Sequence, residues 1–84
     1  MPRFDFDLRR DGVTETDHDG LELPSVHVAR AEAARTAVEM VKEGLAADGV
    51  GLNIAVRDDR GAALFEVAAL VRIEPADRPP GSAT

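Results

Sequence analysis

The sequence predicts a two-layer α+β fold, in which one helix packs on a four-stranded antiparallel sheet in the order β-β-α-β-β. Two observations lead to this prediction. Towards both ends of the chain apolar and polar residues alternate with a period of two, which is typical of strands with one buried face. Between them, residues 26–46 repeat apolar side chains every three or four positions, which is typical of an amphipathic helix. With 84 residues, we expect a single domain over residues 1–74 and a disordered, proline-rich tail over residues 75–84.

The first quarter of the chain predicts two strands joined by a long loop. Residues 3–9 alternate between apolar and charged side chains, and Gly12 supports a turn after them, because glycine adopts positive φ without strain. The polar residues 13–19 show no apolar period and are expected to form a loop. Residues 20–23 are expected to form the second strand. The side chains expected to face the core from these two strands are Phe4, Phe6, Leu8, Leu21 and Leu23.

The helix is predicted to begin after Ser25, whose hydroxyl suits an N-cap because it accepts a hydrogen bond from a free backbone N–H. On its exposed side Arg35 and Glu39 are spaced for an ion pair one turn apart. The dipeptide at 48–49, Asp-Gly, is expected to stop the helix. The apolar face is predicted to consist of Val26, Ala29, Ala33, Ala37, Met40, Val41 and Leu45, widened at its edge by Ala34 and Val38.

A second hairpin is predicted after the helix. Residues 52–56 alternate, residues 58–61 have the composition of a hairpin turn, and residues 63–73 alternate again. The side chains expected to face the core from these strands are Leu52, Ile54, Val56, Phe65, Val67, Ala69, Val71 and Ile73.

Composition excludes several function classes. The chain has no cysteine, which excludes disulfides, thiolate zinc sites and cysteine catalysis. Its net charge is −6 and no segment forms a basic patch, so we expect it to bind neither nucleic acid nor an anionic membrane surface. The longest apolar run, residues 67–71, is too short for a membrane-spanning helix, and the first residues lack the apolar stretch of a secretory signal. We therefore expect a cytoplasmic protein.

The densest polar cluster surrounds Asp17, His18 and Asp19. Carboxylates on both sides of an imidazole offer ligands for a weakly bound divalent cation, whereas the simpler interpretation is a solvated acidic loop. His27, at the start of the helix, suits either a surface position or acid–base chemistry. Since neither histidine has a sequence neighbour that completes a site, we expect no catalytic, cofactor-binding or metal-binding residues and no enzyme activity.

Asp5 and Asp7 are predicted to point away from the core on the first strand. Two carboxylates on one strand face resemble a paired-carboxylate site, but Arg3 and Arg9 flank them. Ion pairs between strands, on a hydrated face of the sheet, are therefore the expected arrangement.

Four segments of the chain resemble a family of small uncharacterised proteins from rhizobia and related alphaproteobacteria, classed as a domain of unknown function. They are the opening MPRF, DGLELP at residues 19–24, ARAEA at residues 29–33 and VRDDRG at residues 56–61. The resemblance covers about residues 1–73 and implies the same α+β fold in a bacterial cytoplasm. It implies no activity and no site residues.

The face of the sheet opposite the helix is expected to carry a modest apolar patch ringed by charge, formed by Ala55, Leu64, Ala68 and Leu70. Because the core is small and rich in alanine, we expect the chain to self-associate, as a homodimer, through this patch, an edge strand or the helix. This predicts a small non-enzymatic protein–protein interaction module. The alternative is an acidic regulatory protein, antitoxin- or inhibitor-like, that binds an unidentified basic partner.

Overall fold

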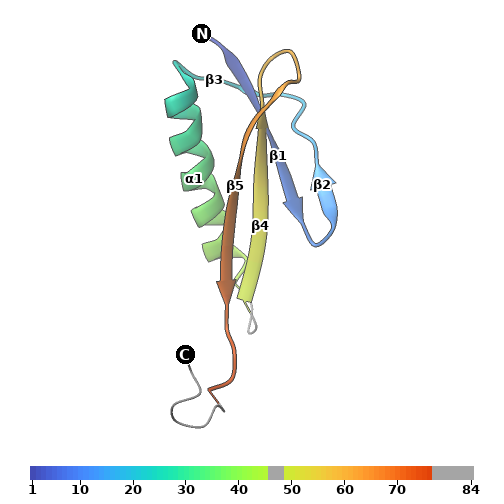
Figure 1. The fold of residues 1–84 in the computed structure, drawn as a ribbon, viewed down its shortest axis with the longest axis vertical. Coiled ribbons are helices and arrows are strands. Elements are labelled where there is room, and N and C mark those ends of the chain that lie inside the picture. The colour runs from blue at the N-terminus through green and yellow to red at the C-terminus, as the bar shows by residue number, and fades with distance from the viewer. Residues whose placement is uncertain (46–48, 77–84) are drawn as a thin grey trace.

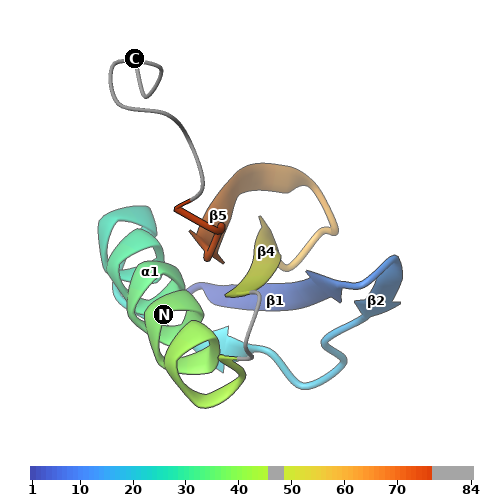
Figure 2. The same cartoon turned by 90° about the horizontal axis from the view of Figure 1, so that it is seen from below.

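A computed structural model describes residues 1–45 and 49–76 and has one helix against an antiparallel sheet (Figure 1). This confirms the predicted α+β class, although the sheet has five strands rather than four. Seen along the long axis, α1 covers one face of the sheet and leaves the other face open (Figure 2). The elements in chain order are β1 (Arg3–Arg10), β2 (Val13–Glu15), β3 (Leu21–Glu22), α1 (Val26–Glu43), β4 (Gly49–Arg57) and β5 (Ala63–Arg72).

The sheet is built around β1 and β4, which lie in its middle. Its strand order is β2-β1-β4-β5, and β3 also pairs with β1. Phe6 lies opposite Val56, and Val56 lies opposite Phe65, so the apolar residues of three strands form a row on one face. β2 and β3 take the two ends of β1: β2 pairs with its last three residues and β3 with its first two. One edge of β5 has no pairing strand among the described residues.

The core lies between α1 and the helix-side face of β1 and β4. Small side chains on the helix let its backbone approach the sheet closely, because alanine projects only a methyl group. Phe6, Leu8, Met40, Phe65 and Val67 surround this core in half-buried positions. The fully buried residues are Phe4, Ala29, Ala33, Ala37, Val41, Leu52, Ile54 and Val56, all of them predicted from the sequence.

The helix begins as predicted but ends earlier. The Ser25 hydroxyl accepts a hydrogen bond from the Val28 N–H at 3.3 Å, which confirms the N-cap. The C-terminal end lies at Glu43, and the Gly44 N–H closes the last turn on the Met40 carbonyl at 2.9 Å. The predicted stop at residues 48–49 is therefore wrong in its position: Gly49 opens β4, and residue 48 lies outside the described residues.

Several predictions about the edges of the apolar pattern are wrong. Residues 13–15 form β2 rather than loop, because Asp11 and Gly12 both adopt positive φ and return the chain along β1 in a tight hairpin. Leu21 is exposed instead of inward: it lies opposite the buried Phe4, but on a two-residue strand at the edge of the sheet. On the helix, Arg35 pairs with Glu32 at 2.9 Å rather than with Glu39. The apolar residues predicted inward but found exposed also include Val26, Val38, Leu45, Val71 and Ile73.

The second hairpin follows its prediction closely. The turn at residues 58–61 is held by the Asp58 carboxylate, which accepts hydrogen bonds from the N–H groups of Arg60 and Ala62 at 2.9 Å. Gly61 adopts φ 83°, which an L side chain would strain. Most of the predicted tail, residues 77–84, lies outside the described residues.

Candidate interaction surface

β5 is the least covered of the long strands. Its helix-side residues Phe65, Val67 and Ala69 are only half-buried, and Val71 is 39% exposed. On the opposite face, Leu64 and Leu70 are 39% and 64% exposed. An edge strand with apolar side chains on both faces offers unpaired backbone groups together with hydrophobic surface, which is the combination that strand pairing between chains uses.

The four residues predicted to form an interface do not form one patch: Ala55, Ala68 and Leu70 share the open face of the sheet, whereas Leu64 lies at a register shift of β5 and lines the groove beside α1. Ala68 and Leu70 lie together on β5, and Leu70 leans over Gly51 of β4: a Cβ added to that glycine would lie 2.9 Å from the leucine Cδ1. Ala55 lies in a row between two carboxylates, opposite Asp7 on one side and Glu66 on the other.

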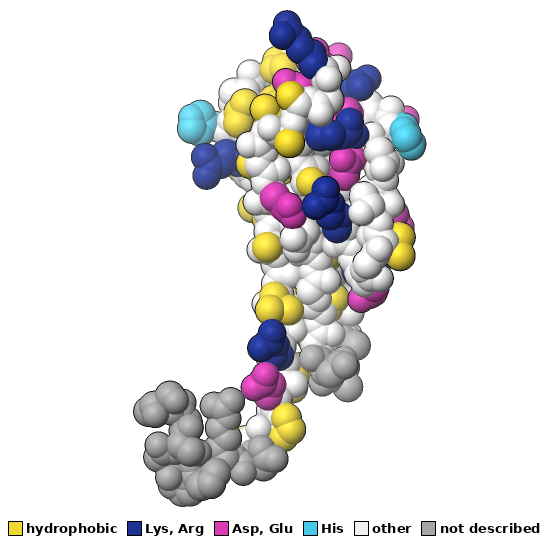
Figure 3. Space-filling view, turned by 45° about the vertical axis from the view of Figure 1, so that its right-hand side comes forward, with side chains coloured by type: hydrophobic (Ala, Val, Ile, Leu, Met, Phe, Trp, Pro, Cys, Tyr) yellow, Lys and Arg dark blue, Asp and Glu magenta, His cyan; other side chains and the backbone are white. Residues whose placement is uncertain are grey.

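Leu64 is separated from Ala68 along β5 by Glu66, which accepts a hydrogen bond from Asn53 at 2.8 Å. The Glu66 carboxylate also lies 3.7 Å from the Arg9 guanidinium. Figure 3 shows the resulting mixture, with small groups of hydrophobic side chains between charged ones of both signs. The predicted patch is therefore interrupted by a charged group at its centre.

A groove runs between α1 and the free edge of β5. Its helix wall carries Val26, Ala31 and Ala34, and its strand wall runs from Leu64 to Val67. Because four consecutive residues of β5 contribute to this wall, the groove runs along the strand. A second hollow lies on the open face of the sheet, where Gly51 has no side chain and Ala68 and Leu70 form one side.

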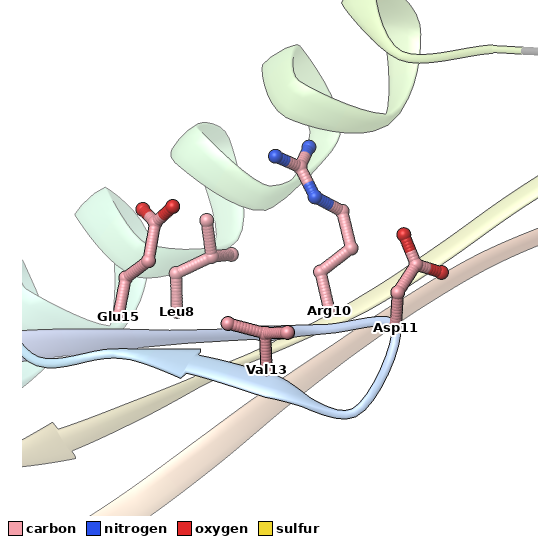
Figure 4. Close-up of a pocket in the computed structure, with 5 residues that line it drawn as sticks. All are labelled: Leu8, Arg10, Asp11, Val13 and Glu15. Carbon is pink, nitrogen blue, oxygen red and sulfur yellow. The ribbon is translucent and has the colours of Figure 1, made fainter.

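The β1–β2 hairpin bounds a smaller hollow at the other side of the molecule. Figure 4 shows Leu8, Arg10, Val13 and Glu15 rising from one side of the hairpin, with Asp11 at its turn. Val13 is 62% exposed there. The hollow mixes two acids, one base and two apolar side chains, so its lining favours no single class of ligand.

The two carboxylates of β1 are buried, not hydrated as predicted. Asp5 and Asp7 are 5% and 8% exposed. Arg57 on β4 binds Asp7 in a bidentate pair, Nε to Oδ2 at 2.7 Å and Nη2 to Oδ1 at 3.0 Å. This hydrogen bond lowers the pKa of Asp7 below its ordinary value against the opposing effect of burial, and raises the pKa of Arg57. The expected partner Arg9 instead pairs with Glu66.

Asp5 is less well satisfied than Asp7. Its Oδ2 lies 3.5 Å from Arg3 and 3.6 Å from Arg57, while its buried Oδ1 has no hydrogen-bond partner. Gly20 covers this oxygen so closely that an added Cβ would lie 2.6 Å from it, and its φ of 72° also favours glycine. The loop before β3 thus packs directly on the carboxylate and excludes solvent.

Asp17 joins that loop to the edge of β1. Its carboxylate accepts hydrogen bonds from the N–H groups of Phe6 at 3.0 Å and of Asp19 and Gly20 at 3.1 Å, and its own N–H donates to Asp7. Burial alone would raise the pKa of Asp17, but these backbone donors outweigh it and lower the pKa below its ordinary value. Asp17 therefore fills the gap that β2 and β3 leave between them on β1.

This arrangement does not form the cation site considered for Asp17, His18 and Asp19. The Asp17 carboxylate is occupied by backbone donors, and both neighbours are exposed. Within residues 1–45 and 49–76 no group of three or more potential ligand residues is arranged to hold a metal ion. His27 is exposed at the start of α1 and lies outside the acidic network.

Sequence reasoning missed Arg57 as the partner of both buried aspartates, which lie fifty residues before it. A signal was present: Arg57 ends a strand with the same outward direction as Asp5 and Asp7, and a long polar segment with one glycine, residues 13–20, was available to cover them. The contact could not be predicted without the register of β1 against β4, which places Asp5 opposite Arg57.

The described residues define a small α+β domain with a closed acidic network on one strand and an open apolar edge on another. The chain belongs to the family described as Domain of unknown function (DUF6894), which matches residues 3–70. No curated protein and no solved structure matches the chain. In the part of the chain that the structure describes, no helix is both long enough and apolar enough to cross a membrane.

Proposed function

We propose that this domain is a small, non-enzymatic interaction module that self-associates through β5. The observation that carries the proposal is the exposure of apolar side chains along an edge strand of ten residues, with Leu70 at 64%. Burying such surface against another chain removes it from water and pairs the free backbone groups in the same step. The predicted contact residues are Ala55, Leu64, Ala68 and Leu70.

The proposal is tested with the variant Leu70→Asp and light scattering behind size exclusion. The wild-type chain is expected to elute with twice its mass of 9.0 kDa, and the variant with the mass of a monomer. Because the Leu70 side chain is mostly in solvent, the variant is expected to keep its helix and to unfold cooperatively as a folded monomer. A variant with the wild-type mass contradicts the role of this surface. Val13→Asp is the matched control, since Val13 is equally exposed but lies on β2.

The acidic regulatory alternative draws less support from the charge distribution. Asp5, Asp7 and Asp17 contribute to the net charge of −6, but Arg57 and backbone N–H groups already engage their carboxylates. The acidic groups offered to a basic partner are therefore fewer than the composition indicates. Co-purification of a basic protein at low salt, lost at high salt, would favour this alternative over self-association.

We place this module in the cytoplasm of an alphaproteobacterium as part of the same proposal. Its support is the resemblance of the four sequence segments to rhizobial proteins and a composition without cysteine. Fractionation of the native host, with an antibody against the chain, tests the compartment.

A further inference from the structure

The two charged residues that flank the apolar centre of β5 are of opposite sign and lie on the same face. Glu66 and Arg72 are six residues apart, with Ala68 and Leu70 between them on that face. The Arg72 side chain is 66% exposed and lies 3.6 Å from Glu74, and the Glu66 side chain is 39% exposed. If two copies of this strand lie antiparallel, the acidic end of one can therefore face the basic end of the other.

The backbone of β5 alternates between β4 and the open edge. Gly49 and Gly51 on β4 approach the carbonyl oxygens of Val71 and Ala69, so these odd-numbered residues turn their backbone groups towards β4. In an antiparallel sheet the direction alternates along the strand, which leaves the N–H and C=O groups of the even-numbered residues from 66 to 72, the part of β5 in regular register, facing outward. These groups are available to a further strand.

We propose that β5 pairs antiparallel with β5 of a second copy of this chain, about a two-fold axis at Ala69. The proposal rests on the proposed function and specifies its partner and register. A two-fold axis perpendicular to a sheet places one residue opposite its own copy, so each register is defined by a single central residue. With Ala69 at the centre, Glu66 lies opposite Arg72 of the second copy, twice, and Ala68 lies opposite Leu70.

Neighbouring registers lose this complementarity. An axis at residue 68 places Glu66 opposite Leu70, and an axis at residue 70 places it opposite Glu74. The axis at Ala69 also pairs Val67 with Val71 and Phe65 with Ile73 on the helix side, so that half-buried apolar residues cover exposed ones. Opposite charges directly across two strands stabilise the pair, whereas like charges destabilise it.

The helix fits the same arrangement. A two-fold axis of this kind keeps both helices on one face of the joined sheet, one on each side of the axis. Ala31, Ala34 and Val38 follow at spacings of three and four and thus share a side of α1, and the first two line the groove beside β5. Val38 is 62% exposed, and the second copy of the helix is expected to cover it.

The test is a charge exchange at the paired positions. Glu66→Arg alone and Arg72→Glu alone each place like charges opposite one another twice, and each is expected to raise the dimer dissociation constant about tenfold or more. An equimolar mixture of the two variants is expected to form a heterodimer with near wild-type affinity, since both cross-strand pairs then regain opposite signs. Glu43→Arg, an exposed charge on a side of α1 away from Ala31, Ala34 and Val38, is the control and is expected to leave the dimer unchanged.

Cysteine cross-linking checks the register independently, because the natural chain contains no cysteine. Ala69→Cys lies opposite its own copy and is expected to form a disulfide-linked dimer under mild oxidation, whereas Ala63→Cys, far from the axis, is expected to form no disulfide cross-link. This measurement decides the register if Glu66→Arg, which also loses the contacts with Asn53 and Arg9, fails to fold.

The outcomes separate the two proposals. Wild-type mass is measured over a hundredfold range of concentration centred at about 1 μM. A chain that stays monomeric over this range overturns both the proposed self-association and the proposed register. A wild-type dimer that Leu70→Asp dissociates, but that ignores the charge exchange and the Ala69→Cys cross-link, overturns this register alone.

Discussion

β4 and β5 are neighbouring strands with the same alternating pattern, yet their apolar residues are buried to different depths. On β4, Leu52, Ile54 and Val56 are at most 3% exposed, whereas on β5 the facing residues are half-buried or exposed. α1 contacts both strands, but β4 has a strand on each side, while β5 has a strand on one side only among the described residues. Alternation therefore predicts the direction of a side chain, and the neighbours of the strand determine its depth.

The largest expected effect tests this difference directly. Ile54→Ala removes a fully buried side chain and leaves a cavity that the close-packed sheet and helix fill only partly, so we expect a loss of about 2–5 kcal/mol in the free energy of unfolding. Leu70→Ala removes a side chain of equal size that is mostly in solvent, and its expected cost is below about 0.5 kcal/mol. Urea unfolding followed by circular dichroism, at low protein concentration, measures both.

Equal costs at the two positions would contradict the comparison. If Leu70→Ala is as destabilising as Ile54→Ala even at concentrations where the chain is monomeric, β5 is packed as tightly as β4. If its cost appears only at high concentration, the stabilisation by Leu70 comes from a contact between chains.

The outer sides of β1 and β5 differ in a similar way. β1 is covered on its outer side, because Asp17 receives the N–H of Phe6 in the gap between β2 and β3, while the outer side of β5 has no such cover among the described residues. Asp17→Ala removes an ionised acceptor shared by three backbone donors and is expected to cost about 1–3 kcal/mol at neutral pH. Asp19→Ala, an exposed neighbour, serves as the control and is expected to cost less than about 0.5 kcal/mol.

The pH dependence of that cost has a defined sign. The pKa of Asp17 in the folded chain lies below the ordinary value of 3.8, so as the pH falls the unfolded chain takes up the proton first. The ionic part of the stabilisation is therefore complete above about pH 5 and is lost as the pH falls through the lowered value. A difference between wild type and Asp17→Ala that stays constant down to about pH 2 would show that the carboxylate charge contributes nothing.

What the sequence predicts well is what depends on near neighbours. Alternation placed Phe4, Ile54 and Val56 in the core, and the Ser25 cap follows from a hydroxyl three residues before a free N–H. β2 escaped prediction because all three of its residues are exposed and therefore carry no apolar period.

The acidic network escaped prediction for a different reason. Its contacts join residues ten and fifty positions apart, from Asp7 to Asp17 and to Arg57, and they depend on strand register and on a loop folding over β1. Composition indicates that aspartates flanked by arginines form ion pairs, but it does not distinguish Arg9 from Arg57. The sequence therefore predicts Asp5 and Asp7 on a hydrated face, although the loop before β3 removes that face from water.

The smallest expected effect lies at the seam between the two strands, where two glycines of β4 meet β5 differently. A Cβ on Gly51 would press on the Cδ1 of Leu70, the far end of a mostly exposed side chain that is free to rotate away. Gly51→Ala is therefore expected to change the free energy of unfolding by less than about 1 kcal/mol in either direction, because the loss of glycine flexibility in the unfolded chain offsets the displacement.

Gly49→Ala is the contrasting variant. Its Cβ would meet the Val71 carbonyl oxygen, a backbone atom, at φ 105°. The last backbone pairs between β4 and β5 must therefore separate to admit it. Hydrogen exchange at the β4–β5 pairing distinguishes the two. Faster exchange near residue 49 in Gly49→Ala, with unchanged exchange near residue 51 in Gly51→Ala, would show that the backbone of β5 yields less than the Leu70 side chain. Equally faster exchange in both variants would mean that Leu70 is held in place within a single chain.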